Sequence, residues 1–277
     1  MTYSIVARDK KTWQLWIAVQ THWFGVGNNV PWLESGIGAI ATQAQTNMDY
    51  GKIWLQLLGK GKYPEEVIKE IWSTDEAFES RQVAIIDTKW NIWVHTGSAC
   101  IKYAWYLLWE DFVVQGNILS NEKVLPAMKQ AYEKNIDRDF SMRLYLSLQA
   151  GQEVGWELRW TQSAAMRIVP SELHAYDIMN LRIDDHINPL QELKRQLSIQ
   201  QAYNYLNQAE EEWVIGSVEK SLELFSHALD IIPESKEFLF WKAFMLKNRG
   251  KTQEAEKILI ENFKEELMWQ ELWNRIH

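Results

Sequence analysis

Residues 1–9 read MTYSIVARD, and residues 14–20 read QLWIAVQ. Both runs are short and rich in β-branched and apolar residues, and a charged turn separates them. This pattern predicts an antiparallel pair of strands over 3–8 and 14–20. Thr2 is then either the first residue of a strand or a terminal hydroxyl placed for chemistry.

The first two thirds of the chain mix strand and helix patterns. Short apolar runs bounded by turn residues predict further strands over 37–43, 82–87, 91–96, 112–116, 162–169 and 178–183. Amphipathic stretches predict helices over 49–58, from Pro64 onward, over 120–135 and over 141–152. Because strands arrive in adjacent pairs, we expect an α+β domain with antiparallel sheets rather than a doubly wound parallel sheet. No glycine-rich nucleotide motif follows any strand.

The pattern becomes purely helical from Asn188, which is followed by Pro189 as in a typical helix start. Gly216 and Gly250 are 34 residues apart and mark turns between helices. Corresponding positions are Ala209 with Ala243, Ser221 with Ala255, and Phe225 with Leu259. This region resembles a pair of tetratricopeptide repeats. We therefore expect two domains, 1–189 and 190–277, and the second would bind a protein partner or form a homo-oligomer.

Composition excludes several classes of function. The net charge is −8 and no cluster of Lys and Arg is present, which argues against nucleic acid and anionic membranes as partners. The single cysteine, Cys100, excludes an internal disulfide and indicates a reduced, cytoplasmic protein. Charges at 8–11 interrupt any signal peptide, and no apolar run is long enough to span a membrane.

Tryptophan is unusually frequent and glycine is scarce, with 16 and 13 copies among 277 residues. Glycine ordinarily makes up about 7% of a chain. Trp90 in DTKWN and Trp13 in DKKTWQ occupy tight turns, where a residue that tolerates positive φ is needed. The alternative, a tryptophan-rich carbohydrate surface, is disfavoured because the excess lies at turns rather than along one face.

A set of segments in order over residues 2–189 resembles the DUF1028 family, which is uncharacterised and grouped with the N-terminal-nucleophile (Ntn) hydrolases. The segments are TYSIVARD, THWFGVGNNVPW, GIGAIATQAQTNMDYG, RQVAIID, HTGSACI, VQGNIL, LSLQAGQ, QSAA and LRIDDH. The resemblance implies a four-layer α/β/β/α Ntn-hydrolase-like sandwich, here followed by an all-α helical-repeat tail.

The resemblance also bears on the tryptophans. Where relatives usually carry glycine, this chain carries Trp13, Trp16, Trp54, Trp90, Trp105, Trp109, Trp156 and Trp160. Eight changes to one residue type suggest a common cause. Our hypothesis is that these positions are UGA codons, decoded as glycine in the source organism and translated here as tryptophan.

The same resemblance implies a catalytic role for Thr2. A threonine hydroxyl needs a base to become nucleophilic, and an N-terminal α-amine with a pKa near ~8 can act as that base. This requires removal of Met1, which a small second residue favours. Thr2 would then attack the carbonyl of a small amide or peptide-like substrate without a cofactor. On the residues alone, Thr2 is better explained as the first residue of a strand.

Further site residues are expected at strand ends. Gly116 and Asn117 offer a backbone N–H and a side-chain amide to an oxyanion. Other candidates for substrate binding are Thr42, Gln43 and Asn47, and each could instead be a turn residue. By analogy with related Ntn folds, Ser163 could orient the terminal amine.

Other candidates are weaker. His22 and His95 read as structural histidines, and Cys100 lacks an evident base in the sequence. Asp184, Asp185 and His186 are consecutive, so in a strand they cannot all converge on one ion, and we expect no metal site. The competing function is a non-catalytic scaffold that binds protein partners through its helical tail.

Overall fold

The computed structural model describes residues 2–155, 160–172 and 178–276. The chain forms two compact units, 1–194 and 195–277, divided within helix α6 (Pro189–Val214). The first unit is α+β and the second is helical. Each is described by itself below.

The larger sheet of the first unit has six antiparallel strands in the order β10-β9-β2-β1-β8-β7. Its strands are β1 (Thr2–Arg8), β2 (Leu15–Thr21), β7 (Trp105–Leu108), β8 (Phe112–Asn117), β9 (Ser163–Val169) and β10 (Met179–Ile183). The first strand is therefore central, with β2 on one side and β8 on the other. This position places the start of the chain's described part between the ends of two neighbours.

The smaller sheet has four antiparallel strands in the order β3-β4-β5-β6. They are β3 (Pro31–Glu34), β4 (Gly38–Ala44), β5 (Arg81–Asp87) and β6 (Ile92–Thr96). Successive residues of β5 belong to different apolar clusters: Ala84 and Ile86 face one, Val83 and Ile85 the other. Because both faces of this strand are covered, its sequence is almost continuously apolar.

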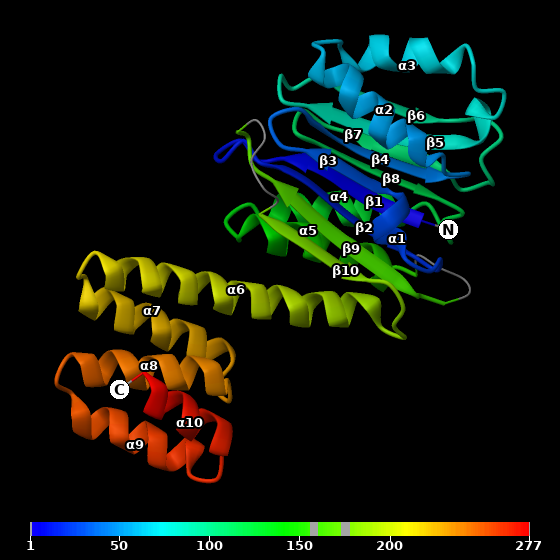
Figure 1. The fold of residues 1–277 in the computed structure, drawn as a ribbon. Coiled ribbons are helices and arrows are strands. Elements are labelled where there is room, and N and C mark those ends of the chain that lie inside the picture. The colour runs from blue at the N-terminus through cyan, green and yellow to red at the C-terminus, as the bar shows by residue number, and fades with distance from the viewer. Residues whose placement is uncertain (1, 156–159, 173–177, 277) are drawn as a thin grey trace. The chain divides into compact units, whose positions relative to one another are not determined.

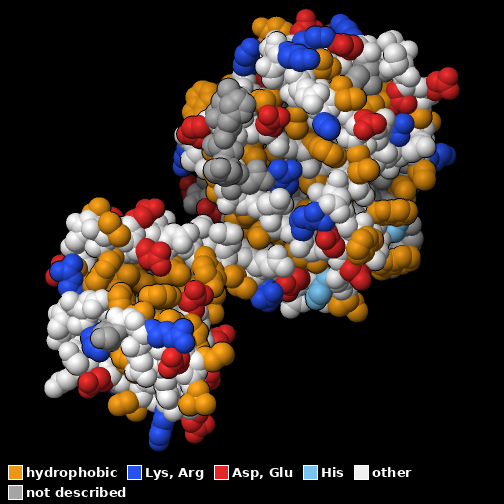
Figure 2. Space-filling view, viewed as in Figure 1, with side chains coloured by type: hydrophobic (Ala, Val, Ile, Leu, Met, Phe, Trp, Pro, Cys, Tyr) orange, Lys and Arg blue, Asp and Glu red, His pale blue; other side chains and the backbone are white. Residues whose placement is uncertain are grey.

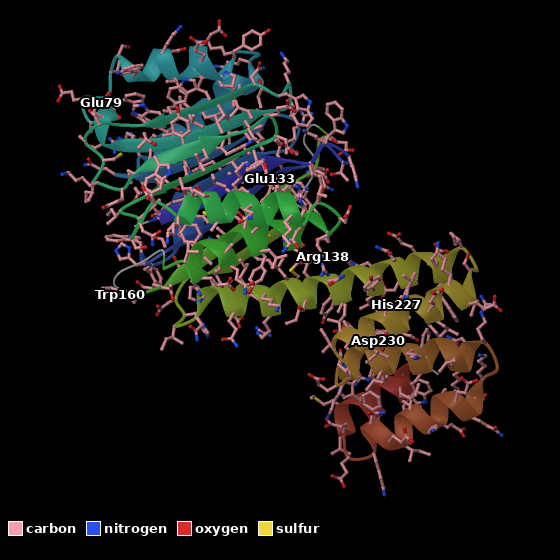
Figure 3. The ribbon with its side chains drawn as sticks, turned by 180° about the vertical axis from the view of Figure 1, so that it is seen from behind. Glu79, Glu133, Arg138, Trp160, His227 and Asp230 are labelled. Atoms are coloured by element: carbon pink, nitrogen blue, oxygen red, sulfur yellow. The ribbon has the colours of Figure 1, made fainter. Side chains whose placement is uncertain are left out.

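The elements of this unit are layered as helices, sheet, sheet and helices (Figure 1). The four-stranded sheet is covered by α2 (Met48–Gly59) and α3 (Pro64–Trp72). The six-stranded sheet is covered by α4 (Val124–Lys134) and α5 (Phe140–Glu153), seen from behind in Figure 3, where Glu133 marks α4. Between the two sheets lies an apolar cluster that includes Val6, Ile17, Ala41 and Ala84. Two short elements, α1 (Val26–Asn29) and the 3₁₀ helix η1 (Phe78–Ser80), complete the unit.

The second unit continues α6 with four further helices. They are α7 (Val218–Ile231), α8 (Lys236–Asn248), α9 (Thr252–Phe263) and α10 (Leu267–Arg275). Gly216 and Gly250 have φ angles of 88° and 76°, which glycine adopts without steric cost. The Ser221 hydroxyl donates to the Ala209 carbonyl at 2.7 Å, so α6 and α7 approach closely where their side chains are small.

All eight predicted strands are present, with ends shifted by at most one residue. The sequence prediction missed β3 and β7, which have four residues each and show no clear alternation. It also missed α1, a single turn. None of the helices in the described part combines the length and apolar composition that a membrane span requires. On the face drawn in Figure 2, Lys and Arg side chains are interspersed with Asp and Glu.

Two of the eight tryptophans at family glycine positions have a backbone conformation that is unfavourable for large residues. Trp13, in the β1–β2 turn, has φ 62°, and Trp90, in the β5–β6 turn, has φ 69°. Such angles are outliers for a bulky side chain and are typical of glycine in this type of hairpin. Their rings lie against the Arg8 guanidinium, with its carbon 4.4 Å and 4.2 Å from the two ring centroids.

Two more of the eight tryptophans leave a buried polar atom without a partner. Trp16 is 4% exposed and Trp54 is fully buried. Neither indole N–H finds a hydrogen-bond acceptor among the described residues. A buried unpaired donor of this kind destabilises a fold by about 1–3 kcal/mol. Four of the eight positions therefore fit tryptophan poorly, and Trp156 lies outside the described residues.

Candidate active site

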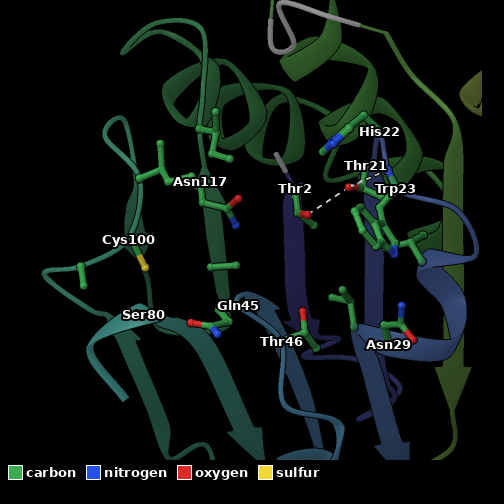
Figure 4. A pocket seen from close by; sticks show the side chains of 16 residues that line it. Thr2, Thr21, His22, Trp23, Asn29, Gln45, Thr46, Ser80, Cys100 and Asn117 are labelled. Atoms are coloured by element: carbon green, nitrogen blue, oxygen red, sulfur yellow. Dashed lines mark hydrogen bonds between the residues drawn. The ribbon is translucent and has the colours of Figure 1, made fainter. Parts of the chain in front are cut away.

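A cavity of about 610 Å³ opens at the end of the six-stranded sheet where β1 begins. Thr2 is opposite Thr21, the last residue of β2, and also opposite Asn117, the last residue of β8. All three side chains line the cavity (Figure 4). The antiparallel register thus brings residues from three separate parts of the sequence to one edge.

Thr2 is held on two sides. Its hydroxyl oxygen lies 3.0 Å from the hydroxyl oxygen of Thr21, and either can donate. Its backbone carbonyl accepts a hydrogen bond from Nε2 of Gln43, at 3.3 Å. These contacts fix both the backbone and the hydroxyl of Thr2 while the side chain remains at the cavity wall.

Gln82, on β5, is the centre of a buried polar network beside Thr2. Its Oε1 accepts from Nε2 of Gln43 at 2.8 Å and from Nδ2 of Asn117 at 3.1 Å. Its Nε2 donates to the carbonyl of Gly116, and also lies within hydrogen-bond distance of Thr96 Oγ1 and the Trp105 carbonyl. Gln43 and Gln82 belong to one sheet, and Gly116 and Asn117 to the other. The network therefore bridges the two sheets at the cavity end.

A second row of polar side chains lies directly behind this one. Ser4 donates to Oε1 of Gln43 at 2.8 Å, and Nε2 of Gln115 donates to Ser4 at 3.3 Å and to the Ala41 carbonyl at 3.0 Å. All of these side chains are fully buried. The sequence analysis missed Ser4, Gln82 and Gln115. These residues could have been found in the sequence as polar side chains within or next to apolar strands, because a buried polar group needs a hydrogen-bond partner.

The remaining predicted site residues are distributed around the cavity rather than in its wall. Ser163 is buried opposite Thr21; its hydroxyl donates to the Trp23 carbonyl and accepts from the Val26 N–H at 3.2 Å. Thr42 is fully buried, and Asn47 caps α2 by accepting from the Asp49 N–H. The structure thus brings Thr2 and Asn117 together at the cavity and places Gln43 and Gly116 immediately behind them.

The family of unknown function DUF1028 matches residues 2–193. The chain belongs to the DUF1028 family. The match includes both sheets and every residue of the cavity wall.

One solved structure belongs to the same family. A DUF1028 protein from Silicibacter pomeroyi is similar at 29% identity and a TM-score of 0.64, over 71% of this chain and 87% of that one. Anbu, an ancestral β-subunit from Yersinia bercovieri, is similar at 11% identity and a TM-score of 0.35, over 70% of this chain and 92% of that one. The second likeness is too low to carry an argument. No curated protein matches the chain.

Two titratable side chains of the DUF1028 domain, those of His22 and Cys100, line the cavity together with Thr2. Burial raises the pKa of the Cys100 thiol, so the thiol remains protonated at neutral pH and is a poor nucleophile. His95 stacks on Phe78, with centroids 4.1 Å apart, and burial lowers the pKa of its imidazole. Since His95 does not line the cavity, its structural interpretation fits its position.

The acidic residues at the end of the DUF1028 domain are each engaged separately. Asp184 pairs with Arg182 at 2.9 Å, and Asp185 accepts from Nε2 of Gln162 at 3.1 Å. Nδ1 of His186 accepts from the Asn188 N–H at 3.0 Å. Within the described part of the chain, no group of three His, Cys, Asp or Glu side chains gathers as a metal site requires.

Proposed function

We propose that the DUF1028 domain of this chain is an Ntn-type amide-bond hydrolase with Thr2 as its nucleophile. The observation that carries the proposal is the position of Thr2. Its hydroxyl belongs to the first residue of a central strand, lines a cavity of about 610 Å³ and lies 3.0 Å from the Thr21 hydroxyl. The succession of helices, sheet, sheet and helices supports an Ntn-hydrolase-like sandwich.

The reaction begins once Met1 has been removed and the Thr2 α-amine is free. The amine takes the proton of the Thr2 hydroxyl as the oxygen attacks the amide carbonyl. The C–N bond of the tetrahedral intermediate then breaks, and the proton passes from the α-amine to the leaving amine. Water next attacks the resulting ester, which releases a carboxylic acid and restores the hydroxyl. No metal or cofactor takes part in these steps.

Donors to the oxyanion come from the neighbouring strand end. Asn117 lines the cavity, and one of its two side-chain N–H bonds is directed at Gln82. The other is available to a negatively charged oxygen in the cavity. Because Gln82 is itself fixed by the Gly116 carbonyl, the Asn117 amide is oriented before substrate arrives.

Covalent labelling tests the proposal. The protein is treated with a β-lactone, and the modified residue is found by peptide mapping in the wild type, in Thr2→Ala and in Thr252→Ala, an exposed threonine of α9 that serves as control. We expect one adduct on the Thr2 peptide in the wild type and in Thr252→Ala, and none in Thr2→Ala. Labelling at Cys100 alone, or equal labelling of Thr2→Ala, contradicts the proposal.

A second candidate function concerns the helical tail. The 34-residue spacing of Gly216 and Gly250, both with positive φ, and the close contact of Ser221 with Ala209 favour a tetratricopeptide-like pair. We propose that it binds a protein partner or a second copy of the chain. Analytical ultracentrifugation of the full chain over a hundredfold range of concentration tests the second-copy form, which a monomer at every concentration contradicts.

We also propose that the eight tryptophans at family glycine positions are glycines in the native protein, encoded by UGA. The positive φ angles of Trp13 and Trp90 and the unpaired indoles of Trp16 and Trp54 support this. The gene sequence tests it: we expect UGA at all eight positions and UGG at Trp23, Trp32 and Trp241. UGG at the eight positions would contradict the proposal.

A further inference from the structure

Among the residues that the structure describes, no permanently charged side chain lines the cavity beside Thr2. The sixteen lining residues, all within the described part of the chain, include no Lys, Arg, Asp or Glu. Besides His22 and Cys100, their polar side chains are amides and hydroxyls, such as those of Asn29 and Thr46. Amides and hydroxyls can donate and accept hydrogen bonds but cannot neutralise a charged ligand. The proposed Thr2 α-amine is neutral in the state in which it acts as the base, so it supplies no counter-charge in the reaction.

Apolar side chains flank Thr2 on two sides. Trp23 and Cys100 lie on opposite sides of Thr2 in Figure 4. The lining residues that follow Trp23 in the chain include Val26 and Val30, and those beside Cys100 include Ala99 and Ile101. A substrate whose carbonyl reaches the Thr2 hydroxyl thus has an apolar wall for the group on each side of that carbonyl.

Two arginines near the cavity wall are each paired with an aspartate, whereas Glu79, near Cys100, is exposed and accepts hydrogen bonds from Ser98. Arg81 donates to the Gln45 carbonyl, and its charge is matched by Asp75, with Nε and Oδ2 3.0 Å apart. Arg182 donates to the side chain of Asn28, next to Asn29, and is matched by Asp184. Neither pair leaves a net charge to attract an ionised group into the cavity.

We infer that this site takes an uncharged amide with apolar groups on both its acyl and its amine side. The inference rests on the proposed function for the reaction but not for the binding preference. Burying an apolar group against such walls is favourable, whereas burying an ionised group without a counter-charge is strongly unfavourable. The cavity volume of about 610 Å³ lies within the range typical of small-molecule sites.

Cys100 provides a binding readout that does not depend on catalysis. It is the single cysteine of the chain and lines the cavity, so a ligand bound there slows its alkylation. The experiment measures the rate of modification by N-ethylmaleimide in the Thr2→Ala variant, by intact mass. The ligands are N-butyryl-leucine isobutylamide and three analogues: the carboxyethylamide, the aminoethylamide and the N-succinyl compound. Hydrolysis of the same four compounds by the wild type is followed in parallel.

We expect the neutral parent to protect Cys100 at a concentration at least about tenfold lower than any charged analogue. Equal or better protection by a charged analogue, or protection by none of the four, overturns the inference. Protection by the parent without hydrolysis supports the binding preference and contradicts the proposed hydrolase. Preferential hydrolysis of a charged analogue supports the hydrolase and contradicts the substrate class.

A charge introduced into the wall sharpens the test. Ile101 is 65% exposed, so Ile101→Lys is expected to fold. It should improve protection by the carboxyethylamide or the N-succinyl compound about threefold, as a partly exposed ion pair does. Ile136→Lys is the matched control, because Ile136 is 60% exposed and does not line the cavity. An equal improvement in both variants overturns the assignment of the preference to this wall.

Discussion

The two ends of β1 differ sharply although a single strand of seven residues joins them. At one end, Thr2 is surrounded by amide and hydroxyl groups that hydrogen-bond to one another and to the strand ends. At the other end, Arg8 is 2% exposed, and its Nε and Nη1 find no hydrogen-bond acceptor in the described part of the chain. It lies between Trp13 and Trp90, both with positive φ.

The two ends differ in whether their buried polar groups have hydrogen-bond partners. A buried polar network that satisfies its members is stable only when each side chain is of the right type and length. A buried guanidinium with unpaired N–H groups is costly, and burial lowers the pKa of Arg8 for the same reason. With glycine at 13 and 90, the turns would relax and Arg8 would regain water. The cavity end is thus explained by the sequence as printed, whereas the strain at the opposite end is what the proposed glycines at 13 and 90 would relieve.

The largest effect is expected at Thr2. Thr2→Ala removes the proposed nucleophile and should lower the rate of amide hydrolysis by roughly 10³-fold or more, whereas Thr2→Ser keeps a hydroxyl and should lose far less. The measurement is the initial rate with N-butyryl-leucine isobutylamide, followed by mass spectrometry. Equal rates for Thr2→Ala and the wild type would show that the cavity end is not catalytic.

Gln82→Leu tests whether the polar network stabilises the cavity end. The substitution leaves the donors of Gln43 and Asn117 and the carbonyl of Gly116 without their partner, so we expect the free energy of unfolding to fall by about 3 kcal/mol. Chemical denaturation measures this. Gln208→Leu, at an exposed position of α6, is the control and should change stability little. A similar small change in both variants would show that the network does not stabilise the cavity end.

The free energy of unfolding should depend on pH through Asp75, which lies near the cavity end. The Arg81 side chain, which donates to Asp75, lowers the pKa of that carboxyl below its ordinary value of 3.8. A lowered folded-state pKa contributes stability that is present above the unfolded value and is lost as pH falls through the folded value. Asp75→Asn should therefore cost about 2 kcal/mol near neutral pH and progressively less below about pH 4.

Denaturation at several pH values measures this difference between wild type and variant. Asp137→Asn, at an exposed position, is the control. A cost for Asp75→Asn that does not change between about pH 7 and pH 3 would be inconsistent with the ion pair as its source.

The smallest expected effect is a gain in stability at the Arg8 end of β1. Trp90→Gly relieves the positive φ of the turn and should raise the free energy of unfolding by about 1 kcal/mol, even though a ring over Arg8 is lost. Trp93→Gly, three residues later in β6, should instead lower it by roughly 2 kcal/mol, because Trp93 packs against the core below α2 and α3. Destabilisation by both substitutions would favour tryptophan as the native residue at 90.

Local sequence patterns were sufficient to predict most helices and strands and part of the candidate site. The strands over 3–8 and 82–87 were predicted because β-branched and apolar residues dominate both runs. Thr2 and Asn117 were placed near one another only through the resemblance to a family. The role of Gln82 could not be predicted, because its partners come from a different sheet and depend on how the two sheets face each other. Ser163 was assigned to the amine from sequence, and the structure shows its hydroxyl engaged with Trp23 and Val26.

The intact mass of the protein purified from its native source tests both ends of β1 at once. The account predicts a chain that lacks Met1, which frees the Thr2 amine, and whose mass is lower by eight replacements of tryptophan with glycine. A mass that matches the printed sequence, with Met1 retained and all 16 tryptophans present, would contradict it.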